Sequence, residues 1–173
     1  RLDRLLRLDP ESRTASFQAG IDGPSLEAAL AQHGYTLGHF PQSFEHSTLG
    51  GWIATRSVGQ QSDGYGGIDE LLVCARVVTP AGVIRTLDVP RAASGPELNQ
   101  LLLGSEGVLG VIVEATVRIR PIAARSDERG MLFRSFADGV TAVRAAARAE
   151  LPVAMMRLSD ADETELSLLL RHD

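Results

Sequence analysis

The chain has 173 residues and a formal net charge of −5, with 44% hydrophobic and 23% charged residues. This composition is typical of a soluble globular protein and excludes a disordered chain, a coiled coil and a collagen. No apolar run approaches the ~20 residues that a membrane-spanning helix needs. The acidic balance favours neither a nucleic-acid backbone nor an anionic lipid surface. We therefore expect one globular domain, or one domain and part of another, with no nucleic-acid partner and no transmembrane segment.

The basic and sulfur-containing residues exclude several kinds of site. All 17 basic residues are Arg, so the chain has no Lys to bind phosphate, form a Schiff base or act as a general base. The four His residues have neither metal-ligand spacing nor a Cys nearby, so no metal site is expected. Cys74 is the only cysteine and lies in an apolar run, which favours a buried thiol in a reducing, cytoplasmic compartment. The chain begins at Arg1 without a secretion signal, and we interpret it as a piece of a longer protein.

In chain order, the first 120 residues predict strands and helices separated by many loops. A strand at 12–19 precedes a helix at 25–33, which begins after Pro24 and ends before Gly34. Residues 39–67 show no clean periodicity and predict a long ordered loop or a functional region. The other predicted elements are a hairpin of strands at 71–79 and 83–87, a helix at 96–103 and a strand at 111–119.

After a joint at 121–130, the sequence predicts a simpler order of strand, helix, strand and helix. The predicted ranges are a strand at 131–136, a helix at 138–149 capped by Asp138, a strand at 153–158 and a helix at 161–170. This order begins a sheet with helices on one face. The acidic residues after Ser159 are typical of a helix N-terminus rather than of a carboxylate site, with Ser159 or Asp160 as the cap.

Two glycine-rich segments, 41–52 and 104–112, could contact a cofactor. Glycine lets backbone N–H groups approach a ligand and donate to phosphate oxygens or to the acceptor edge of a flavin ring. Ser47 and Thr48 add hydroxyl donors. The second segment spaces its glycines as G-x-x-G-x-x-G and follows a helix, so it is not the dinucleotide-binding fingerprint. From the glycines alone, two tight turns between core elements explain the pattern equally well.

Two further side chains have both a structural and a functional interpretation. Trp52 is interpreted as a core residue rather than as a stacking platform. Arg157 lies in the apolar run 153–158, where its five N–H donors need a partner. A structural carboxylate and an anionic ligand group are the two alternatives for that partner.

Together the two glycine-rich segments resemble a known class of flavoproteins. Residues 41–59 resemble the second FAD-contacting stretch of the vanillyl-alcohol-oxidase-type, or PCMH-type, flavoproteins, and residues 104–112 resemble the third. The motifs are most similar to those of the alkyldihydroxyacetonephosphate synthases and their bacterial relatives, although Gln42 and His46 depart from the usual pattern. They are His-x-Pro-x-Ser-x-Glu at 39–45, Ser-Thr-x-Gly-Gly-Trp at 47–52, Thr-Arg-x-x-Gly at 55–59, Gly-Ser-Glu-Gly at 104–107 and Arg-Leu-x-Asp at 157–160.

The resemblance implies an α/β (α+β) fold. Residues 1–121 would form the second lobe of a PCMH-type FAD-binding domain, and residues 122–173 the beginning of a ferredoxin-like α+β cap domain. The implied FAD is non-covalent. The family's first, pyrophosphate-binding stretch and its catalytic residues would lie outside this chain, so we expect the chain alone to bind FAD weakly and to have no turnover. Arg157 is implied to lie toward the flavin and the substrate. The implied FAD-contacting residues are Pro41, Gln42, Ser43, Phe44, Glu45, His46, Ser47, Thr48, Gly50, Gly51, Thr55, Arg56, Ser57, Val58, Glu106, Gly107, Val108, Leu109, Gly110, Val111 and Ile112.

Three functional hypotheses follow. The leading one is an FAD-dependent transferase of ether-lipid synthesis, which exchanges the acyl group of acylated dihydroxyacetone phosphate for an alkyl group. The first alternative is an FAD-linked oxidase or dehydrogenase of a 2-hydroxy acid or an alcohol, and the second is a non-catalytic isolated domain. The resemblance further implies a small-molecule substrate, a homodimer, and an enzyme that is cytoplasmic or peripheral to a membrane.

Overall fold

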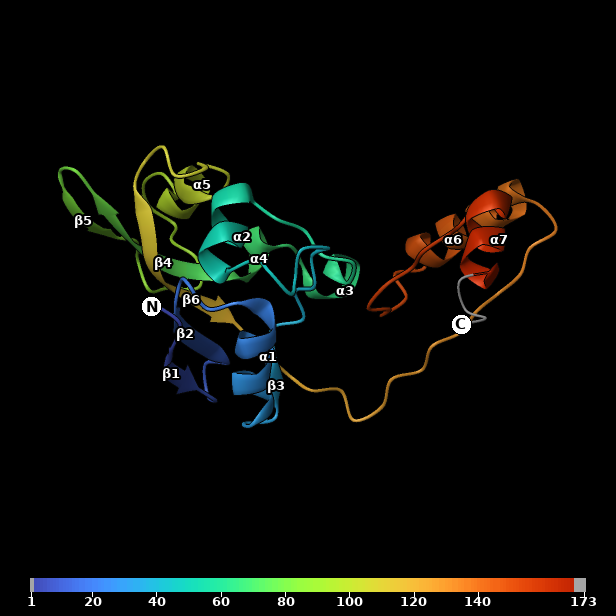
Figure 1. Ribbon diagram of the computed structural model, residues 1–173, viewed down its shortest axis with the longest axis horizontal. Helices are drawn as coiled ribbons and strands as arrows, with labels where there is room; N and C mark the ends of the chain where they lie inside the picture. The colour runs from blue at the N-terminus through green and yellow to red at the C-terminus, as the bar shows by residue number, and fades with distance from the viewer. Residues whose placement is uncertain (1, 170–173) are drawn as a thin grey trace. The chain divides into compact units, whose positions relative to one another are not determined.

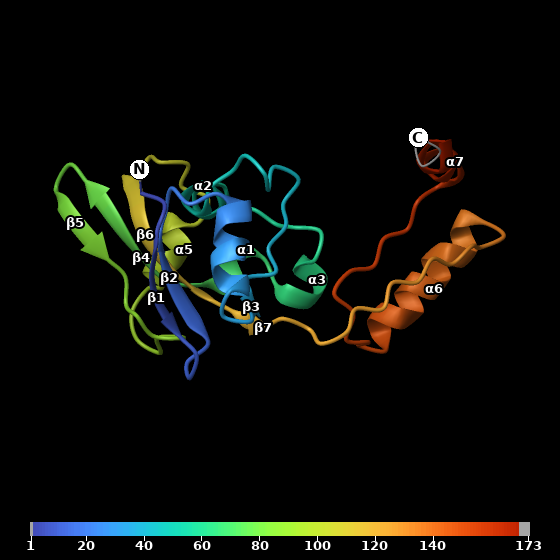
Figure 2. The ribbon, with the colours of Figure 1, turned by 60° about the horizontal axis from the view of Figure 1, so that its bottom comes forward.

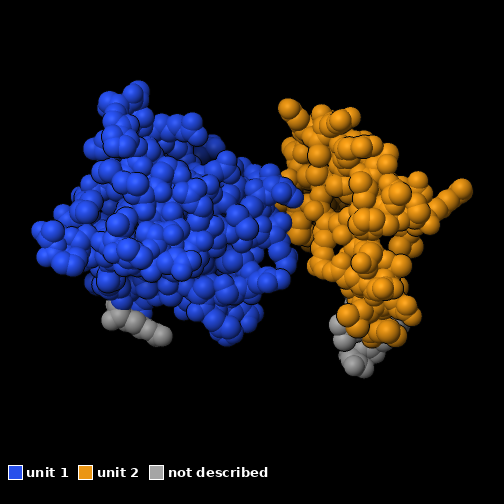
Figure 3. All heavy atoms as spheres, turned by 90° about the horizontal axis from the view of Figure 1, so that it is seen from above, with its two compact units in different colours: residues 1–123 blue, residues 124–173 orange. Residues whose placement is uncertain are grey.

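The computed structural model describes residues 2–169. The chain forms two compact units, residues 1–123 and 124–173, which Figure 3 shows in different colours. The strands all belong to the first unit, and the described part of the second contains two helices and no strand. The two units therefore differ in architecture.

The first unit is built on a five-stranded antiparallel sheet with the order β1-β2-β6-β4-β5 (Figure 1). The predicted hairpin is confirmed as β4 and β5, which pair from Thr79 and Gly82 onward. The strand β6 comes last in the sequence but lies in the centre of the sheet, between β2 and β4. The strands are β1 (Leu5–Asp9), β2 (Thr14–Gln18), β4 (Leu72–Thr79), β5 (Gly82–Arg85) and β6 (Val111–Arg118).

The two faces of this sheet differ in chemistry because successive side chains of a strand point to opposite faces. Phe17 of β2 and Val117 of β6 lie on the core face and are fully buried. On the other face, the hydroxyls of Ser16 and Thr116 from the same two strands lie 2.8 Å apart. The alternation that predicted strands at 12–19 and 111–119 therefore also indicates which side of the sheet faces the core.

Helices α1, α2, α4 and α5 lie on the core side of the sheet (Figures 1 and 2). Helix α2 packs against β6, and α4 and α5 pack against β4. The core between these layers contains Phe17, Leu26, Leu30, Leu37, Leu49, Trp52, Ile53, Ile68, Leu102 and Val117. The helices are α1 (Gly23–Ala31), α2 (Leu49–Thr55), α3 (Ser62–Tyr65), α4 (Ile68–Leu71) and α5 (Leu98–Leu102).

Helix α1 confirms the prediction made from its end signals. Asp22 Oδ1 accepts a hydrogen bond from Ser25 N at 2.9 Å, and Pro24 occupies the first turn, where its missing N–H costs nothing. Gly34 follows the helix with a φ of 79°, a conformation that glycine adopts readily. The chain then enters a small two-stranded sheet, in which β3 (Tyr35–Thr36) pairs with β7 (Arg120–Pro121).

The prediction of a long loop at 39–67 is only partly right, because α2 and α3 form within it. The Gly50–Gly51 pair gives α2 a low intrinsic helix propensity. Gly50 nevertheless fits there because a β-carbon at that position would lie 3.0 Å from the Ala19 side chain and carbonyl. Thr48 caps the helix, and the buried Trp52 and Ile53 attach it to the core. Tertiary packing, not local propensity, stabilises this helix.

In the second unit, the predicted strands at 131–136 and 153–158 are wrong, and with them the predicted strand–helix–strand–helix order. Both segments are irregular, and neither pairs with another segment among the described residues. A strand is stabilised by hydrogen bonds to a neighbouring strand, so apolar composition alone does not create one. Two helices do form, α6 (Phe136–Arg148) and α7 (Ala161–Leu169), and position 170 lies outside the described residues.

The caps of these two helices differ in how well the sequence predicted them. Helix α6 is capped by Ser135 and not by Asp138 as predicted, since Ser135 Oγ accepts a hydrogen bond from Asp138 N at 3.2 Å. Asp138 lies one turn further on and accepts from the same hydroxyl at 2.9 Å. Helix α7 begins as predicted, because Asp160 Oδ1 accepts from Glu163 N at 2.8 Å.

Candidate functional site

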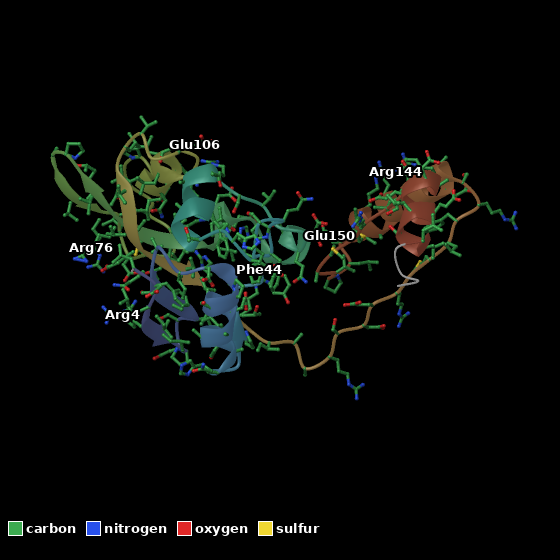
Figure 4. The ribbon with its side chains drawn as sticks, viewed as in Figure 1. Arg4, Phe44, Arg76, Glu106, Arg144 and Glu150 are labelled. Carbon is green, nitrogen blue, oxygen red and sulfur yellow. The ribbon has the colours of Figure 1, made fainter. Side chains whose placement is uncertain are left out.

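The two glycine-rich segments lie side by side in the first unit, although about fifty residues of sequence separate them. Gly104 N donates to Ile53 O at 3.1 Å, and Glu106 N donates to Ala54 O at 2.9 Å. Figure 4 shows Glu106 beside α2 accordingly. Residues 41–58 and 104–112 therefore meet where α2 ends and the second segment begins, as two stretches of one cofactor site must.

Arg56 reinforces this junction. It follows α2 in the left-handed conformation, with a φ of 50°, and its guanidinium reaches across to α5. The Nη2 atom donates to Gln100 Oε1 at 2.9 Å and to Gln100 O at 3.3 Å. These bonds are internal to the chain, so Arg56 links the first segment to α5, the helix that precedes the second segment.

The segment before α2 is held from both sides. The Glu27 carboxylate of α1 accepts from Leu37 N and Gly38 N, both at 3.1 Å, and from the Thr36 hydroxyl at 2.8 Å. Further along, Phe44 stacks parallel to Trp52 with ring centroids 6.3 Å apart. In Figure 4, Phe44 lies near α1. Glu27 was not predicted as a site residue, because nothing in the local sequence indicates that this acidic side chain accepts hydrogen bonds from the following loop.

Trp52 is the core residue that the sequence predicted, being 2% exposed. Its indole Nε1 donates to Ser47 Oγ at 2.6 Å, and Ser47 Oγ donates in turn to Ser43 O at 2.7 Å. Ser43 Oγ also donates to Ser47 Oγ at 3.1 Å. The Ser47 hydroxyl proton is therefore used within the chain in this structure, and donation from this hydroxyl to a ligand stays a prediction.

The hydroxyls of Thr48, Thr55 and Ser57 differ in whether their protons are used within the chain. Thr55 Oγ1 donates to Gly51 O at 3.0 Å and so has no proton left for a ligand. Thr48 Oγ1 only accepts, from Gly51 N at 3.3 Å. Ser57 Oγ makes one hydrogen bond, 2.7 Å long, to His39 Nε2. Among the described residues of 41–58, only Thr48 and Ser57 have hydroxyls that can still donate outward.

His39 is the second residue whose importance the sequence analysis missed. It is fully buried, and its ring lies edge-on to Trp52 with centroids 5.1 Å apart. Burial lowers the pKa of His39 to about 4, because the charged imidazolium would lose its hydration there. The Nδ1 atom has no hydrogen-bond partner among the described residues. The sequence signal that could have identified His39 is its place as the first residue of the His-x-Pro-x-Ser-x-Glu motif.

The segment 104–112 exposes backbone rather than polar side chains. Gly104, Glu106 and Gly107 have φ values of 76°, 49° and 83°, which turn the chain sharply. A β-carbon on Gly107 would meet no atom within 4 Å, so the space beside it is open. Val108 is 87% exposed. The N–H groups of Gly107 and Leu109 donate to nothing among the described residues.

The remaining predicted contact residues surround this junction or lie beside it. Pro41 is buried, whereas Gln42, Glu45 and His46 are exposed. Val58 is 68% exposed at the end of the first segment. Gly110 lies against β4, because a β-carbon there would be 2.5 Å from Val78 O, and Val111 and Ile112 begin β6.

These residues fit FAD by the chemistry of their donors. The backbone N–H groups of Gln42 and Ser43, like those of Gly107 and Leu109, have no acceptor among the described residues. Such groups can donate to the acceptor atoms of a phosphate or of a flavin ring. The exposed valines beside them suit the apolar faces of the ring. The segments 41–58 and 104–112 are therefore able to hold a large cofactor with many acceptor atoms.

Arg157 lies in the second unit, in an irregular segment rather than in the predicted strand. Its guanidinium Nη2 pairs with Glu163 Oε1 of α7, and both side chains are substantially exposed. Of the two alternatives for its partner, the structure shows a carboxylate, and the place of Arg157 near the flavin and the substrate stays a prediction. The structure does not place Arg157 relative to the two segments of the first unit.

Three further observations concern Cys74, metal ligands and membrane-spanning helices. Cys74 is buried as predicted, and this burial raises the pKa of its thiol. No three metal-ligating side chains within residues 2–169 are grouped so as to bind an ion. The described helices include none that is both long and apolar enough to cross a bilayer.

Comparison with protein families identifies the class. The chain belongs to the FAD binding domain family (FAD_binding_4), whose model matches residues 1–88 and so includes the segment 41–58. FAD is therefore the cofactor that this chain serves.

The relatives narrow the class further. The alkyldihydroxyacetonephosphate synthase of Dictyostelium discoideum is 42% identical over 167 residues, covering 96% of this chain and 27% of that protein. The uncharacterized FAD-linked oxidoreductase YgcU of Escherichia coli K12 is 40% identical over 119 residues, covering 68% of this chain and 25% of that protein. A solved alkyldihydroxyacetonephosphate synthase structure superposes with a TM-score of 0.91 at 41% identity, covering 96% of this chain and 30% of that one.

These comparisons confirm the PCMH-type flavoprotein fold and the resemblance to the synthases. The chain spans between a quarter and a third of the length of these relatives.

Proposed function

We propose that this chain is part of an FAD-dependent enzyme that exchanges the acyl group of acylated dihydroxyacetone phosphate for an alkyl group. The observation that carries the proposal is the 42% identity to alkyldihydroxyacetonephosphate synthase over 96% of the chain. That span contains both glycine-rich segments, whose outward donors match the needs of a flavin nucleotide.

The chain's own contribution is to bind and orient the cofactor. Residues 41–58 and 104–112 hold FAD with the free N–H groups of Gln42, Ser43, Gly107 and Leu109. Arg56 fixes the first segment against α5, the helix that leads into the second segment, through its bonds to Gln100. When bound, FAD supplies the reactive ring at which the exchange takes place, and it is oxidised at the end of the cycle as at the start. Preorganised donors lower the cost of ordering the cofactor.

The two units take different roles in this proposal. Residues 1–121 are the second lobe of the FAD-binding domain, and residues 122–173 begin the cap domain that covers the substrate. Arg157 recognises an anionic group of the substrate. Its exposed guanidinium is compatible with that role, because the Glu163 carboxylate that now pairs with it can be exchanged for a phosphate.

The test is an exchange assay on the FAD-loaded, full-length enzyme that contains this chain. Acylated dihydroxyacetone phosphate and a labelled fatty alcohol should give a labelled ether lipid and one equivalent of free fatty acid. The visible absorbance of the oxidised flavin should be the same before and after turnover. Fatty-acid release without ether-lipid formation would contradict the proposal.

An FAD-linked oxidoreductase is the second candidate, because YgcU matches 68% of the chain at 40% identity. Anaerobic mixing with substrate separates the two functions. An oxidase or dehydrogenase of a 2-hydroxy acid or an alcohol would bleach its flavin, whereas the transferase would not. Bleaching by a panel of such substrates would replace the first proposal with this one.

Two properties of the whole protein complete the proposal. The resemblance to the synthases favours a homodimer, which light scattering of the purified protein tests. The single, buried cysteine favours a reducing, cytoplasmic compartment, with association at a membrane surface as the alternative. Cell fractionation distinguishes these two locations.

A further inference from the structure

The buried pair of His39 and Ser57 has a polar arrangement that the core does not explain. His39 is fully buried, yet its Nδ1 atom has no hydrogen-bond partner among the described residues. Its Nε2 atom lies 2.7 Å from Ser57 Oγ. A buried polar side chain that satisfies only one of its two nitrogens is costly, so a specific use for the other bond is expected.

The direction of the His39–Ser57 hydrogen bond follows from the protonation of the ring. Burial lowers the pKa of His39 to about 4, so the imidazole is neutral near pH 7 and has a single N–H. If that proton were on Nδ1, a buried donor would have no acceptor. Unpaired buried N–H groups are rarer than under-satisfied acceptors. The proton is therefore on Nε2, which donates to Ser57 Oγ.

The Ser57 hydroxyl proton is then free to donate elsewhere. The bond to His39 is the only hydrogen bond that Ser57 Oγ makes among the described residues. The neighbouring hydroxyls of Ser47 and Thr55 donate within the chain, to Ser43 O and Gly51 O respectively. Ser57 is thus one of two hydroxyls of this segment that can donate outward, and the only one whose oxygen is held by a buried ring.

The backbone around Ser57 is held as firmly as its side chain. Ser57 N donates to Trp52 O at 2.9 Å, and Ile68 N donates to Ser57 O at 3.3 Å. Next to it, Gln60 N donates to Phe40 O at 3.2 Å, which ties the segment to the neighbour of His39. Ser57 itself is half-buried, and Val58 after it is 68% exposed. The Ser57 hydroxyl therefore lies between the buried core and the exposed residues that are proposed to contact FAD.

We propose that His39 is a positioning residue that turns the Ser57 hydroxyl into an oriented hydrogen-bond donor to an acceptor atom of FAD. The inference rests on the proposed FAD site. It assigns His39 and Ser57 to one unit: the ring fixes the oxygen, and the oxygen presents its proton to the cofactor. A fixed donor loses little rotamer freedom on binding, so it contributes more than a freely rotating one.

The decisive experiment measures FAD affinity and melting temperature on the same set of variants. Ser57→Ala removes the donor, His39→Leu removes the group that orients it, and His39→Gln retains an N–H donor near the position of Nε2. His33→Leu, in the exposed turn that follows α1, is the matched control. FAD dissociation constants come from titration of the full-length apoenzyme, followed by flavin fluorescence.

We expect Ser57→Ala and His39→Leu each to weaken FAD binding about three- to tenfold. The double variant should lose no more than the larger single effect, because the two residues act as a unit. His39→Gln should stay within about twofold of the parent protein, as should His33→Leu. Proton–nitrogen NMR of the parent should show the His39 proton on Nε2.

Several results would overturn the inference. One is that the Ser57→Ala variant binds FAD as tightly as the parent protein. Another is that the NMR measurement places the His39 proton on Nδ1. If His39→Leu does not fold, Ser57→Ala and the NMR measurement still decide. Additive losses in the double variant would show that the residues act separately. A full-length parent enzyme that binds no FAD would instead refute the proposed function, so the two failures are distinguishable.

Discussion

The two units of the chain differ in where their apolar side chains lie. In the first unit, residues from all layers contribute to one core, including fully buried Phe17, Leu26, Leu49 and Ile53. In the second unit, Gly139 is the single buried residue among those described, and Leu132 is 92% exposed. Both units contain helices, so the presence of helices alone does not indicate a buried core.

This difference shows which predictions from sequence depend on a core. The helices of the second unit form because their signals are local: a capping side chain and helix-forming residues such as the alanines of α6. Its predicted strands at 131–136 and 153–158 had only apolar composition in their favour. The strands of the first unit form because each has a hydrogen-bonded neighbour on which to align.

Truncation of a core residue should separate the units most clearly. Phe17→Ala should lower the free energy of unfolding by about 3–5 kcal/mol, because it leaves a cavity in a filled core. Leu132→Ala should change it by less than about 0.5 kcal/mol, because that side chain is already in solvent. Urea denaturation of both variants measures the contrast. Equal losses would mean that Leu132 is buried in the protein as it exists in solution.

Adding a methyl group to a glycine tests the same contrast by overpacking. A β-carbon on Gly110 would lie 2.5 Å from Val78 O, and the φ of Gly110 is 149°, which few L-residues adopt. Gly110→Ala should therefore cost about 1–3 kcal/mol. In the second unit, Gly130→Ala meets no atom within 4 Å and should be neutral or slightly stabilising. Thermal melts compare them, and a neutral Gly110→Ala would contradict the observed packing against β4.

The buried His39 should make the first unit sensitive to pH. Its pKa is lowered to about 4 in the folded state, against an ordinary value of 6.5. Between these values the unfolded chain binds a proton that the folded chain does not. Stability should therefore be greatest above pH 6.5 and fall as the pH drops toward 4, by at most ~1.4 kcal/mol per pH unit.

Chemical denaturation over this pH range, on the parent and on His39→Gln, measures the effect. The variant should show a shallower loss, because it lacks the titrating ring. Parallel profiles for the two proteins would mean that His39 is accessible to water and titrates normally.

Removing a helix cap should act globally in one unit and locally in the other. Asp22→Ala and Ser135→Ala each remove a side-chain acceptor at the start of a helix, which costs about 1 kcal/mol. Helix α1 is attached to the core, so Asp22→Ala should lower the unfolding midpoint while α1 stays protected. Helix α6 lacks that support, so Ser135→Ala should increase hydrogen exchange within α6 itself. Local exchange in α1 with Asp22→Ala, or a lowered unfolding midpoint with Ser135→Ala, would contradict the conclusion that only the first unit has a buried core.

The smallest effect on stability is expected at Arg157. Its ion pair with Glu163 is exposed, and such pairs contribute about 0.5 kcal/mol or less. If Arg157 binds an anionic group of the substrate, Arg157→Ala should reduce turnover of the FAD-loaded enzyme by at least about tenfold, since a charged hydrogen bond is lost. Turnover and melting temperature are measured together. Losses in proportion to each other would favour a purely structural role.

The sequence predicted much of the first unit because the relevant signals are local. Alternation predicted β2 and β6, Pro24 and Gly34 bounded α1, and the Thr79–Gly82 turn joined the hairpin. The motifs at 39–59 and 104–112 indicated a flavoprotein, and the family comparison confirms it. Burial of Trp52 and Cys74 also followed from their apolar neighbours.

Only the tertiary structure decided how the donors of the site are used. The sequence marks Ser47, Thr55 and Ser57 alike as hydroxyls of one segment. In the fold, Ser47 and Thr55 donate within the chain, and Ser57 meets a histidine eighteen positions away. Hydrogen-bond partners are set by which elements pack together, and composition does not contain that information. For the same physical reason, apolar runs at 131–136 and 153–158 stay irregular where no neighbouring strand receives them.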